Sequence, residues 1–564
     1  MSWMIYKSKG KDKSPVMKGG NMLLLEDEWV VEYDFGNRFC NDKTIINTKE
    51  QFVLIDGVVL NSQESEVKDF YTSRCGTDMY PICKKLRGPF TGIHIDCNNK
   101  KISAFGNQTG DTTVFYYSQD GIYAIATNIK VLLDYVSLNG GKVSLDQEAA
   151  EQMLSLGYLV GGHTFVHEIR RTMPGYMVEI DDNKIAEKRY HKFSNEEPLD
   201  ISFDEAIELV DCEFKKAVKR CFDKDVEYGY KNHLVDMSGG LDSRMVNCVA
   251  KKLGYDAVTN LCFAKNNSVE HQYSYTVSMN LGNEFIFKCL DDLHFIFDVE
   301  DILRMNNSIS IYIGITGGNR LLSDLNFDKF GLEHTGMIGD VVIGSFVKNA
   351  TTQVMVTDSN IKNIYFNPQG DYLPSNIGEY PNYEMYAMYY RAFQSAVTSH
   401  YVRRYYTEPV SPFLDVDFLQ VCMSIPVQYR ANHKLYFAWI RSKYPEMLTL
   451  PTTHPDPSKK SIYSLARKVL GTKTTSIKQM LRKIGLFGLI SDKKNMHPLD
   501  YWYEERTDIR NFMDNYYSEH IDMLRDYPEI QDKVTQIYNS YGAMNKFQVL
   551  TVLGAVKLYF GGER

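Results

Sequence analysis

The chain has 564 residues, of which 44% are hydrophobic and 24% charged, and its net charge is −8. This length predicts about two to four domains, and the negative charge gives no electrostatic basis for binding nucleic acid. With no run of about 20 apolar residues and no signal peptide at the start, we expect a cytoplasmic protein with no membrane partner. The ten cysteines lack zinc-like spacing, so we expect buried free thiols.

Residues 1–195 are rich in short apolar runs separated by turn signals, which predicts a first domain built of antiparallel strands. Asn98-Asn99 and Gln119-Asp120-Gly121 fall between paired runs, as hairpin turns do. Residues 143–157 predict a helical insert. The expected strands lie near residues 2–6, 29–33, 52–55, 92–95, 114–117 and 122–126.

A second domain is predicted to begin after a polar linker at residues 191–199. Ser202 and Glu205 have the spacing of a capping box at a helix start. An apolar stripe at helical spacing follows, which predicts a helix that packs on a sheet. The stripe consists of Ile207, Val210, Phe214, Val218 and Cys221.

Residues 233–246 predict a strand, a glycine turn and a helix, and we call residues 238–243 of this stretch the phosphate loop. Two adjacent glycines, Gly239 and Gly240, allow close backbone approach, and the free N–H groups of a helix start suit an anion. Asp242 would repel a phosphate unless a divalent cation lay between them, which indicates magnesium. The alternative is an ordinary strand-to-helix turn capped by Asp242.

Strands predicted at residues 257–264 and 285–289 flank a predicted helix at residues 269–281. This alternation favours a parallel sheet with helices on its faces, in which ligands bind beyond the carboxyl ends of the strands. The phosphate loop and the residues that follow Phe263 both lie at such ends. The sequence therefore predicts a nucleotide site at this edge of the sheet.

The phosphate loop, Ser238-Gly239-Gly240-Leu241-Asp242-Ser243, resembles the signature of the ATP pyrophosphatases, and among these the asparagine synthetase family most. The resemblance implies that the loop holds the pyrophosphate of ATP and that the end of the Phe263 strand lies by the adenine. Residues 333–346 resemble the second signature of the family, in which Gly339 belongs to the site and Asp340 is the second magnesium ligand beside Asp242. Lys434 falls where the family has its active-site lysine; a surface lysine is the alternative.

Four segments of the first domain resemble the N-terminal glutaminase domain of the same family: residues 52–61, 85–90, 107–117 and 164–178. Where the family has a nucleophilic cysteine this chain has Ser2, and Asp56 and Val58 replace its oxyanion asparagine and next glutamate. These changes predict a degenerate domain without glutaminase activity. In the second signature, Met337 and Val341 replace acidic residues, which indicates an acceptor other than that of asparagine synthesis, as in β-lactam synthetases and lasso-peptide cyclases.

The fold class expected from the resemblance combines α+β and α/β parts: an Ntn-hydrolase-like antiparallel sheet sandwich, a parallel-sheet ATP pyrophosphatase domain and a helical C-terminal part. The boundaries are residues 1–195 for the class II amidotransferase-type domain, 200–450 for the synthetase domain and 451–564 for the helical extension. Asp242, Asp340 and Lys434 are the expected catalytic residues, with ATP and Mg²⁺ as cofactors.

The expected activity is an amide-forming ligase that adenylates a small-molecule or peptide carboxylate, releases pyrophosphate and accepts an amine donor. A homodimer is compatible with the resemblance. Three alternatives stay open: a non-catalytic nucleotide-binding or scaffold homologue, a true glutamine-hydrolysing asparagine synthase, and a different ATP pyrophosphatase such as a synthetase of NAD or GMP.

Overall fold

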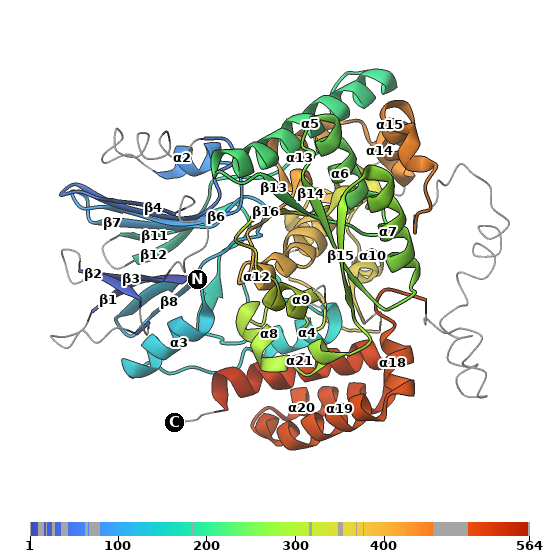
Figure 1. The fold of residues 1–564 in the computed structure, drawn as a ribbon. Helices are drawn as coiled ribbons and strands as arrows, with labels where there is room; N and C mark the ends of the chain where they lie inside the picture. The colour runs from blue at the N-terminus through green and yellow to red at the C-terminus, as the bar shows by residue number, and fades with distance from the viewer. Residues whose placement is uncertain are drawn as a thin grey trace.

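The structure is a computed structural model, and Figure 1 shows its fold. It describes residues 2–8, 16–17, 20–24, 29–34, 43–62, 66, 79–181, 184–314, 318–347, 354–367, 369–375, 377–454 and 494–561. Two six-stranded antiparallel sheets are followed along the chain by one five-stranded parallel sheet with helices around it. The predicted combination of antiparallel and parallel sheets with helices is confirmed.

The first half is a sandwich of the two antiparallel sheets (Figure 1). Its core is formed by apolar side chains from both sheets, among them Trp3, Phe52 and Val178, each with no exposed surface. The first sheet has the order β10-β8-β9-β1-β3-β2, with β1 (Ser2–Lys7), β2 (Asn21–Leu24), β3 (Trp29–Asp34), β8 (Phe115–Gln119), β9 (Ile122–Ala126) and β10 (Ile169–Arg171). The second has the order β12-β11-β7-β6-β5-β4, with β4 (Lys43–Asn47), β5 (Gln51–Gly57), β6 (Phe90–Asp96), β7 (Lys101–Phe105), β11 (Tyr176–Asp181) and β12 (Lys184–Arg189).

All six expected strands are present, and both predicted hairpins are confirmed, since β6 pairs with β7 and β8 with β9. The helical insert is shorter than predicted. Helix α4 (Gln147–Leu156) begins only after Asp146, whose side chain accepts a hydrogen bond from the Ala149 N–H as a cap, and Leu145 pairs with Val166 in extended conformation. Helix α3 (Ile129–Leu138) was not predicted, although Ile129, Leu132, Leu133 and Val136 have helical spacing and are buried. Helix α2 (Met79–Lys85) precedes β6.

Helix α5 (Phe203–Glu227) opens the second half with the predicted capping box between Ser202 and Glu205. All members of its predicted apolar stripe are buried. The parallel sheet has the order β15-β14-β13-β16-β17, so β13, which precedes the phosphate loop, lies at its centre. Its elements are β13 (Asn232–Asp236), α6 (Asp242–Lys252), β14 (Val258–Ala264), α7 (Val269–Leu281), β15 (Glu284–Cys289), β16 (Phe330–His334) and β17 (Pro409–Val410).

Shorter helices lie between β15 and β17 in the chain and after β17. They are α8 (Val299–Met305), α9 (Asn319–Asp324), α10 (Asp358–Ile361), α11 (Tyr383–Ala387), α12 (Ser399–Arg403), α13 (Val416–Ser424), α14 (Val427–Arg430) and α15 (Lys434–Lys443). Short 3-10 or π turns join them at η3 (His294–Ile296), η5 (Val341–Ser345), η6 (Lys362–Ile364), η7 (Ile377–Glu379), η8 (Met388–Phe393), η9 (Ala396–Thr398), η10 (Pro412–Leu414), η11 (Ala431–His433) and η12 (Pro445–Leu448).

The C-terminal part is helical where the structure describes it, while residues 455–493 of the predicted extension lie outside the described residues. It contains α18 (Leu499–Glu505), α19 (Thr507–His520), η14 (Ile521–Leu524), α20 (Pro528–Ser540) and α21 (Ala543–Phe560). These helices lie together beneath the rest of the molecule in the view of Figure 1. Helix α21 is buried against α4 and α8, so one hydrophobic core joins the first half, the second half and the C-terminal helices.

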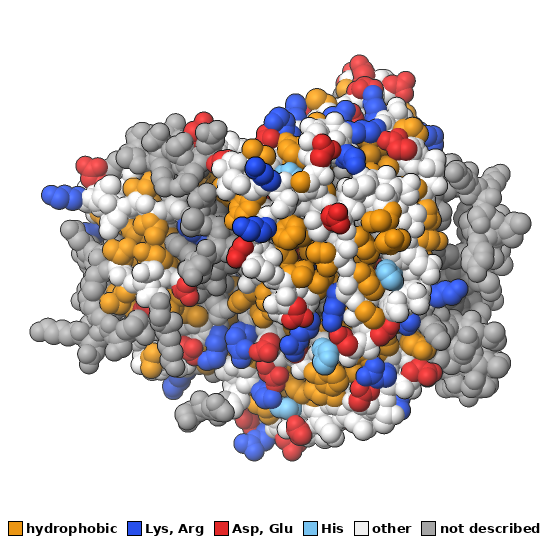
Figure 2. Space-filling view, in the orientation of Figure 1, with side chains coloured by type: hydrophobic (Ala, Val, Ile, Leu, Met, Phe, Trp, Pro, Cys, Tyr) orange, Lys and Arg blue, Asp and Glu red, His pale blue; other side chains and the backbone are white. Residues whose placement is uncertain are grey.

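Among the described residues, no helix is both long and apolar enough to cross a lipid bilayer. The eight described cysteines are free thiols, as expected; five of them are buried, Cys97 and Cys289 are partly exposed, and Cys212 is exposed. Figure 2 shows acidic and basic side chains interspersed over the face drawn.

Candidate nucleotide site

The phosphate loop connects the end of β13 to the start of α6, as predicted, and is held by its own hydroxyl groups. The Ser238 N–H donates to Ser243 Oγ at 2.9 Å, the two hydroxyls lie 2.9 Å apart, and the Gly240 N–H donates to Ser238 Oγ at 3.2 Å. Leu241 is 4% exposed and anchors the loop in the core beneath it. The loop is therefore preformed around the two serines.

The second predicted segment packs directly against the phosphate loop. A Cβ on Gly336 would lie 2.4 Å from the Ser243 backbone nitrogen, and a Cβ on Gly339 would lie 2.7 Å from the Asp242 carboxyl carbon. Only glycine permits this approach at either position. The Asp340 N–H donates to Asp242 Oδ2 at 3.1 Å, so the structure brings the two predicted magnesium ligands together although 98 residues separate them.

The electrostatics of this acidic pair are unfavourable as they stand. Burial, together with the charge of Asp340, raises the pKa of Asp242 well above its ordinary value. The Tyr436 hydroxyl donates to Asp242 Oδ1 at 2.6 Å and opposes the shift. Two neighbouring carboxylates that offer oxygen ligands are the donor set that Mg²⁺ takes, and a divalent cation would remove their repulsion. The residues present therefore fit a magnesium ion.

Lys434 does not join this group in the structure. It is the first residue of α15, its side chain is exposed, and its ammonium lies 4.6 Å from the centre of the Phe203 ring at the start of α5. Tyr436 lies two residues further on, about 200° around the helix, and this is the side chain of α15 that reaches Asp242. The predicted catalytic role of Lys434 is thus not matched by its position here.

Phe263 lies near the carboxyl end of β14, as predicted, but its ring is largely buried. The Arg403 guanidinium lies 5.5 Å from the ring centre, and a Cβ on Gly318 would lie 2.6 Å from ring atom Cδ1. The Phe263 ring thus lies between the Arg403 guanidinium and the backbone at Gly318.

Three further acidic groups beside the loop were not predicted. Glu270, in the first turn of α7, accepts a hydrogen bond from the Gly239 N–H at 2.9 Å. Asp236, at the end of β13, accepts from Arg403 at 3.1 Å, and Arg403 also pairs with the buried Glu333. Burial raises the pKa of Asp236, and Glu333 adds to the effect while Arg403 opposes it. The position of Asp236 immediately before the loop was the available sequence signal.

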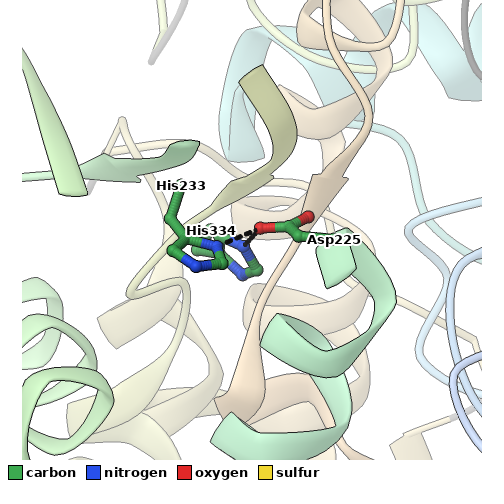
Figure 3. A group of neighbouring side chains, drawn as sticks. All are labelled: Asp225, His233 and His334. Carbon is green, nitrogen blue, oxygen red and sulfur yellow. Dashed lines mark hydrogen bonds and ion pairs between the residues drawn. The ribbon is translucent and has the colours of Figure 1, made fainter. Parts of the chain in front are cut away.

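A separate buried cluster joins α5 to the same two strands (Figure 3). Asp225 Oδ2 lies 2.6 Å from His233 Nδ1 of β13 and 2.8 Å from His334 Nε2 of β16, and the Leu332 N–H donates to Asp225 Oδ1 at 2.7 Å. Although these are metal-ligand residue types, both imidazoles are at hydrogen-bond distance from one oxygen, which leaves no room for an ion between them. We interpret the cluster as a hydrogen-bonded buried carboxylate.

Two residues of the predicted glutaminase position, Ser2 and Asp56, lie near the ends of strands β1 and β5. Ser2 is the first residue of β1 and pairs with Asp34 of β3. Asp56, at the end of β5, forms an ion pair with Lys43 at 2.9 Å. It lines a cavity between the two halves of about 650 Å³, counting its opening, together with Thr91, Arg404 and other polar residues. The Asp56 carboxylate is therefore paired with Lys43 at the wall of this cavity.

No family model and no curated protein matches the sequence. Among solved structures, the chain is similar to the allosteric regulatory enzyme of purine biosynthesis, at 9% identity and a TM-score of 0.20, over 39% of this chain and 51% of that chain. It is also similar to glutamine phosphoribosylpyrophosphate amidotransferase from B. subtilis, complexed with ADP and GMP, at 10% identity and a TM-score of 0.23, over 52% of this chain and 85% of that one. The chain thus spans about half the length of the first of these proteins. Matches at this level carry no assignment of activity, and membership in the asparagine synthetase family stays a prediction.

Proposed function

We propose that the protein is an ATP- and magnesium-dependent ligase that forms an amide. A carboxylate oxygen of the substrate attacks the α-phosphorus of ATP, the bond to the β-phosphate oxygen breaks, and pyrophosphate leaves. An amine then attacks the acyl adenylate, loses a proton and displaces AMP. The carboxylate belongs to a small molecule or a peptide.

The observation that carries this proposal is the contact between the phosphate loop and the Asp340 loop. Both loops follow neighbouring parallel strands, β13 and β16, and meet through glycines that a side chain would force apart. The result is two carboxylates beside a loop with serine hydroxyls, at the strand ends where ligands bind in such sheets. An ordinary capped turn would explain Asp242 but not its pairing with Asp340.

Each residue of the site then has a role that its position supports. Ser238, Gly239, Gly240 and Ser243 would hold the pyrophosphate portion, and Asp242 and Asp340 would hold Mg²⁺, which neutralises phosphate charge when bound. The Tyr436 hydroxyl fixes the orientation of Asp242. Met337 is partly buried, and its uncharged side chain stands where an acid was expected from the family, which favours an amine other than ammonia.

The decisive experiment follows pyrophosphate release from ATP and Mg²⁺ with a panel of carboxylates, using the purified chain and its Asp242→Asn variant. We expect release with at least one carboxylate and a loss of about 100-fold or more in the variant. Asp328→Asn is the matched control, since Asp328 is an exposed aspartate outside the site. Release from no carboxylate, or equal release by both proteins, would contradict the ligase and favour a binding or scaffold role.

The same preparation tests the first half of the chain. Because a serine hydroxyl is a weak nucleophile at neutral pH and Asp56 is a carboxylate, we expect glutamate release from glutamine to stay at background. Release that disappears in Ser2→Ala would instead support a glutamine-hydrolysing enzyme.

A further inference from the structure

Three N–H groups of the phosphate loop, those of Ser238, Gly239 and Gly240, are already engaged, and one of them is held from outside the loop. Ser238 and Gly240 donate to the loop's own serine hydroxyls, whereas the Gly239 N–H donates to the Glu270 carboxylate. A carboxylate and a phosphate oxygen are the same kind of acceptor for a backbone N–H. Glu270 therefore occupies the position that an anionic ligand of Gly239 would take.

The second carboxylate oxygen of Glu270 also lies against the loop. A Cβ on Gly239 would be 2.9 Å from Glu270 Oε2, so the absence of a side chain at residue 239 is what admits the carboxylate. Burial raises the pKa of Glu270, while the hydrogen bond from Gly239 opposes the shift. The Glu270 carboxylate is thus partly desolvated at the loop. Outside the loop it would still be stabilised, because an acidic side chain in the first turn of a helix interacts favourably with the helix dipole.

The other side of Gly239 is fixed by residues 451–454, which we call the covering segment. The Thr453 N–H and the Thr452 hydroxyl donate to the Gly239 carbonyl oxygen at 2.9 and 3.2 Å. Arg244 is fully buried in α6 and donates to the carbonyl oxygens of Met447 and Pro451 at 2.7 and 2.6 Å. The covering segment is therefore tied to the loop and to helix α6. In contrast, the hydrogen bond between Glu270 and the Gly239 N–H can be broken by rotation of the Glu270 side chain alone.

We propose that the Glu270 carboxylate is an internal competitor that closes the phosphate loop and is displaced when a polyphosphate binds. This inference rests on the proposed function and adds a regulatory step to the same site. Two anions cannot share the Gly239 N–H, and the charges of Glu270 and a phosphate repel each other at that distance. The apparent affinity for polyphosphate is consequently lower than the affinity of the open loop. It equals the affinity of the open loop multiplied by the fraction of molecules in which Glu270 has left the Gly239 N–H.

The test measures binding of inorganic pyrophosphate with Mg²⁺ to the full chain by calorimetry. We expect Glu270→Ala to bind about 10-fold more tightly than the unchanged protein, because the competing charged hydrogen bond is gone. Glu270→Gln keeps the shape and an acceptor oxygen but loses the charge, so its affinity should fall between the two. Asp526→Ala removes one exposed carboxylate from the C-terminal part and should leave the affinity unchanged.

Asp242→Asn separates this inference from the proposed function. If pyrophosphate binds the unchanged chain and Asp242→Asn abolishes binding, the site is real, and equal or weaker binding by Glu270→Ala would overturn the inference alone. If the unchanged chain and both Glu270 variants fail to bind pyrophosphate, both proposals fall. Thermal melting of each variant checks that the fold is retained, and the conservative Glu270→Gln carries the test if Glu270→Ala does not fold.

Discussion

Asp225 and Asp242 are both carboxylates beside strands β13 and β16, and the protein treats them in opposite ways. Asp225 is fully buried, with two imidazoles and a backbone N–H at hydrogen-bond distance, and the charge of His334 and the hydrogen bonds of both imidazoles hold its pKa below the ordinary value despite burial. Asp242 lies in the loop after β13, where burial and the charge of Asp340 raise its pKa. One acid is neutralised by the fold itself, and the other is not.

This difference separates an acid that serves stability from an acid that serves binding. A buried carboxylate with all its hydrogen-bond partners present needs nothing further, whereas a pair of carboxylates that repel each other is most stable with a cation between them. Charge repulsion that is left uncompensated at one place, while other polar groups are paired, is a common feature of functional sites. The following predictions test whether the two acids differ in this way.

The largest effect is expected from Asp225→Ala, which should lower the free energy of unfolding by about 3–5 kcal/mol. It leaves His233, His334 and the Leu332 N–H without their common acceptor in a buried place. Chemical denaturation measures the change. Asp223→Ala, two residues earlier on the exposed face of α5, is the control and should cost about 1 kcal/mol or less. A loss of less than about 1 kcal/mol in Asp225→Ala would show that the fold does not depend on this cluster.

Tyr436→Phe should lower the free energy of unfolding by about 1–1.5 kcal/mol, because it removes a partly buried hydrogen bond to the Asp242 carboxyl group. Tyr444→Phe is matched to it, since the Tyr444 hydroxyl donates to Asp211 Oδ1 at 2.7 Å just after the same helix. We expect both variants to lose stability and only Tyr436→Phe to change the affinity for magnesium pyrophosphate. An equal effect of both variants on binding would place Tyr436 outside the site.

Asp242→Asn is expected to have the opposite sign, a gain of about 1 kcal/mol in the free energy of unfolding without divalent cations. The amide keeps the shape of the side chain and removes the repulsion from Asp340. Added Mg²⁺ should stabilise the unchanged protein and not the variant, which a thermal melt with and without the ion measures. A variant less stable than the unchanged protein without Mg²⁺ would mean that the pair is satisfied in some other way.

The pH dependence of this gain follows from the direction of the Asp242 shift. A carboxyl group whose pKa is raised on folding costs nothing below its unfolded value of about 4, and the cost grows as the pH rises toward and through the raised folded value. The difference in stability between Asp242→Asn and the unchanged protein should therefore vanish near pH 4 and increase toward alkaline pH. A difference that is constant with pH would show that repulsion from Asp340 is not its cause.

The sequence was sufficient for elements with a strong local pattern and insufficient for contacts between distant segments. Helix α7 was predicted with its observed bounds, and in the structure Ser268 caps its start and Gly282 ends it. The pairing of Asp242 with Asp340 followed from two recognisable loops. The contacts of Tyr436 and Glu270 with the loop were missed, because 194 and 31 residues separate the partners and no periodicity encodes which side chain of a packed helix reaches a given atom.

Lys434 is where these two kinds of inference disagree, and its substitution should have the smallest effect. Sequence resemblance gives it a catalytic role, whereas in the structure its exposed ammonium lies over Phe203, a contact that contributes about 0.5 kcal/mol. We expect Lys434→Ala to change stability by no more than this and pyrophosphate release by less than about 2-fold, like the control Lys443→Ala at the end of the same helix, where Lys443 is partly exposed and pairs with Glu208. If Lys434→Ala instead lowers release about 100-fold while Lys443→Ala does not, the ammonium must turn from Phe203 toward the carboxylate pair when ATP binds. The contact of Lys434 with Phe203 would then be a second interaction, besides that of Glu270 with Gly239, that must break before ATP is bound productively.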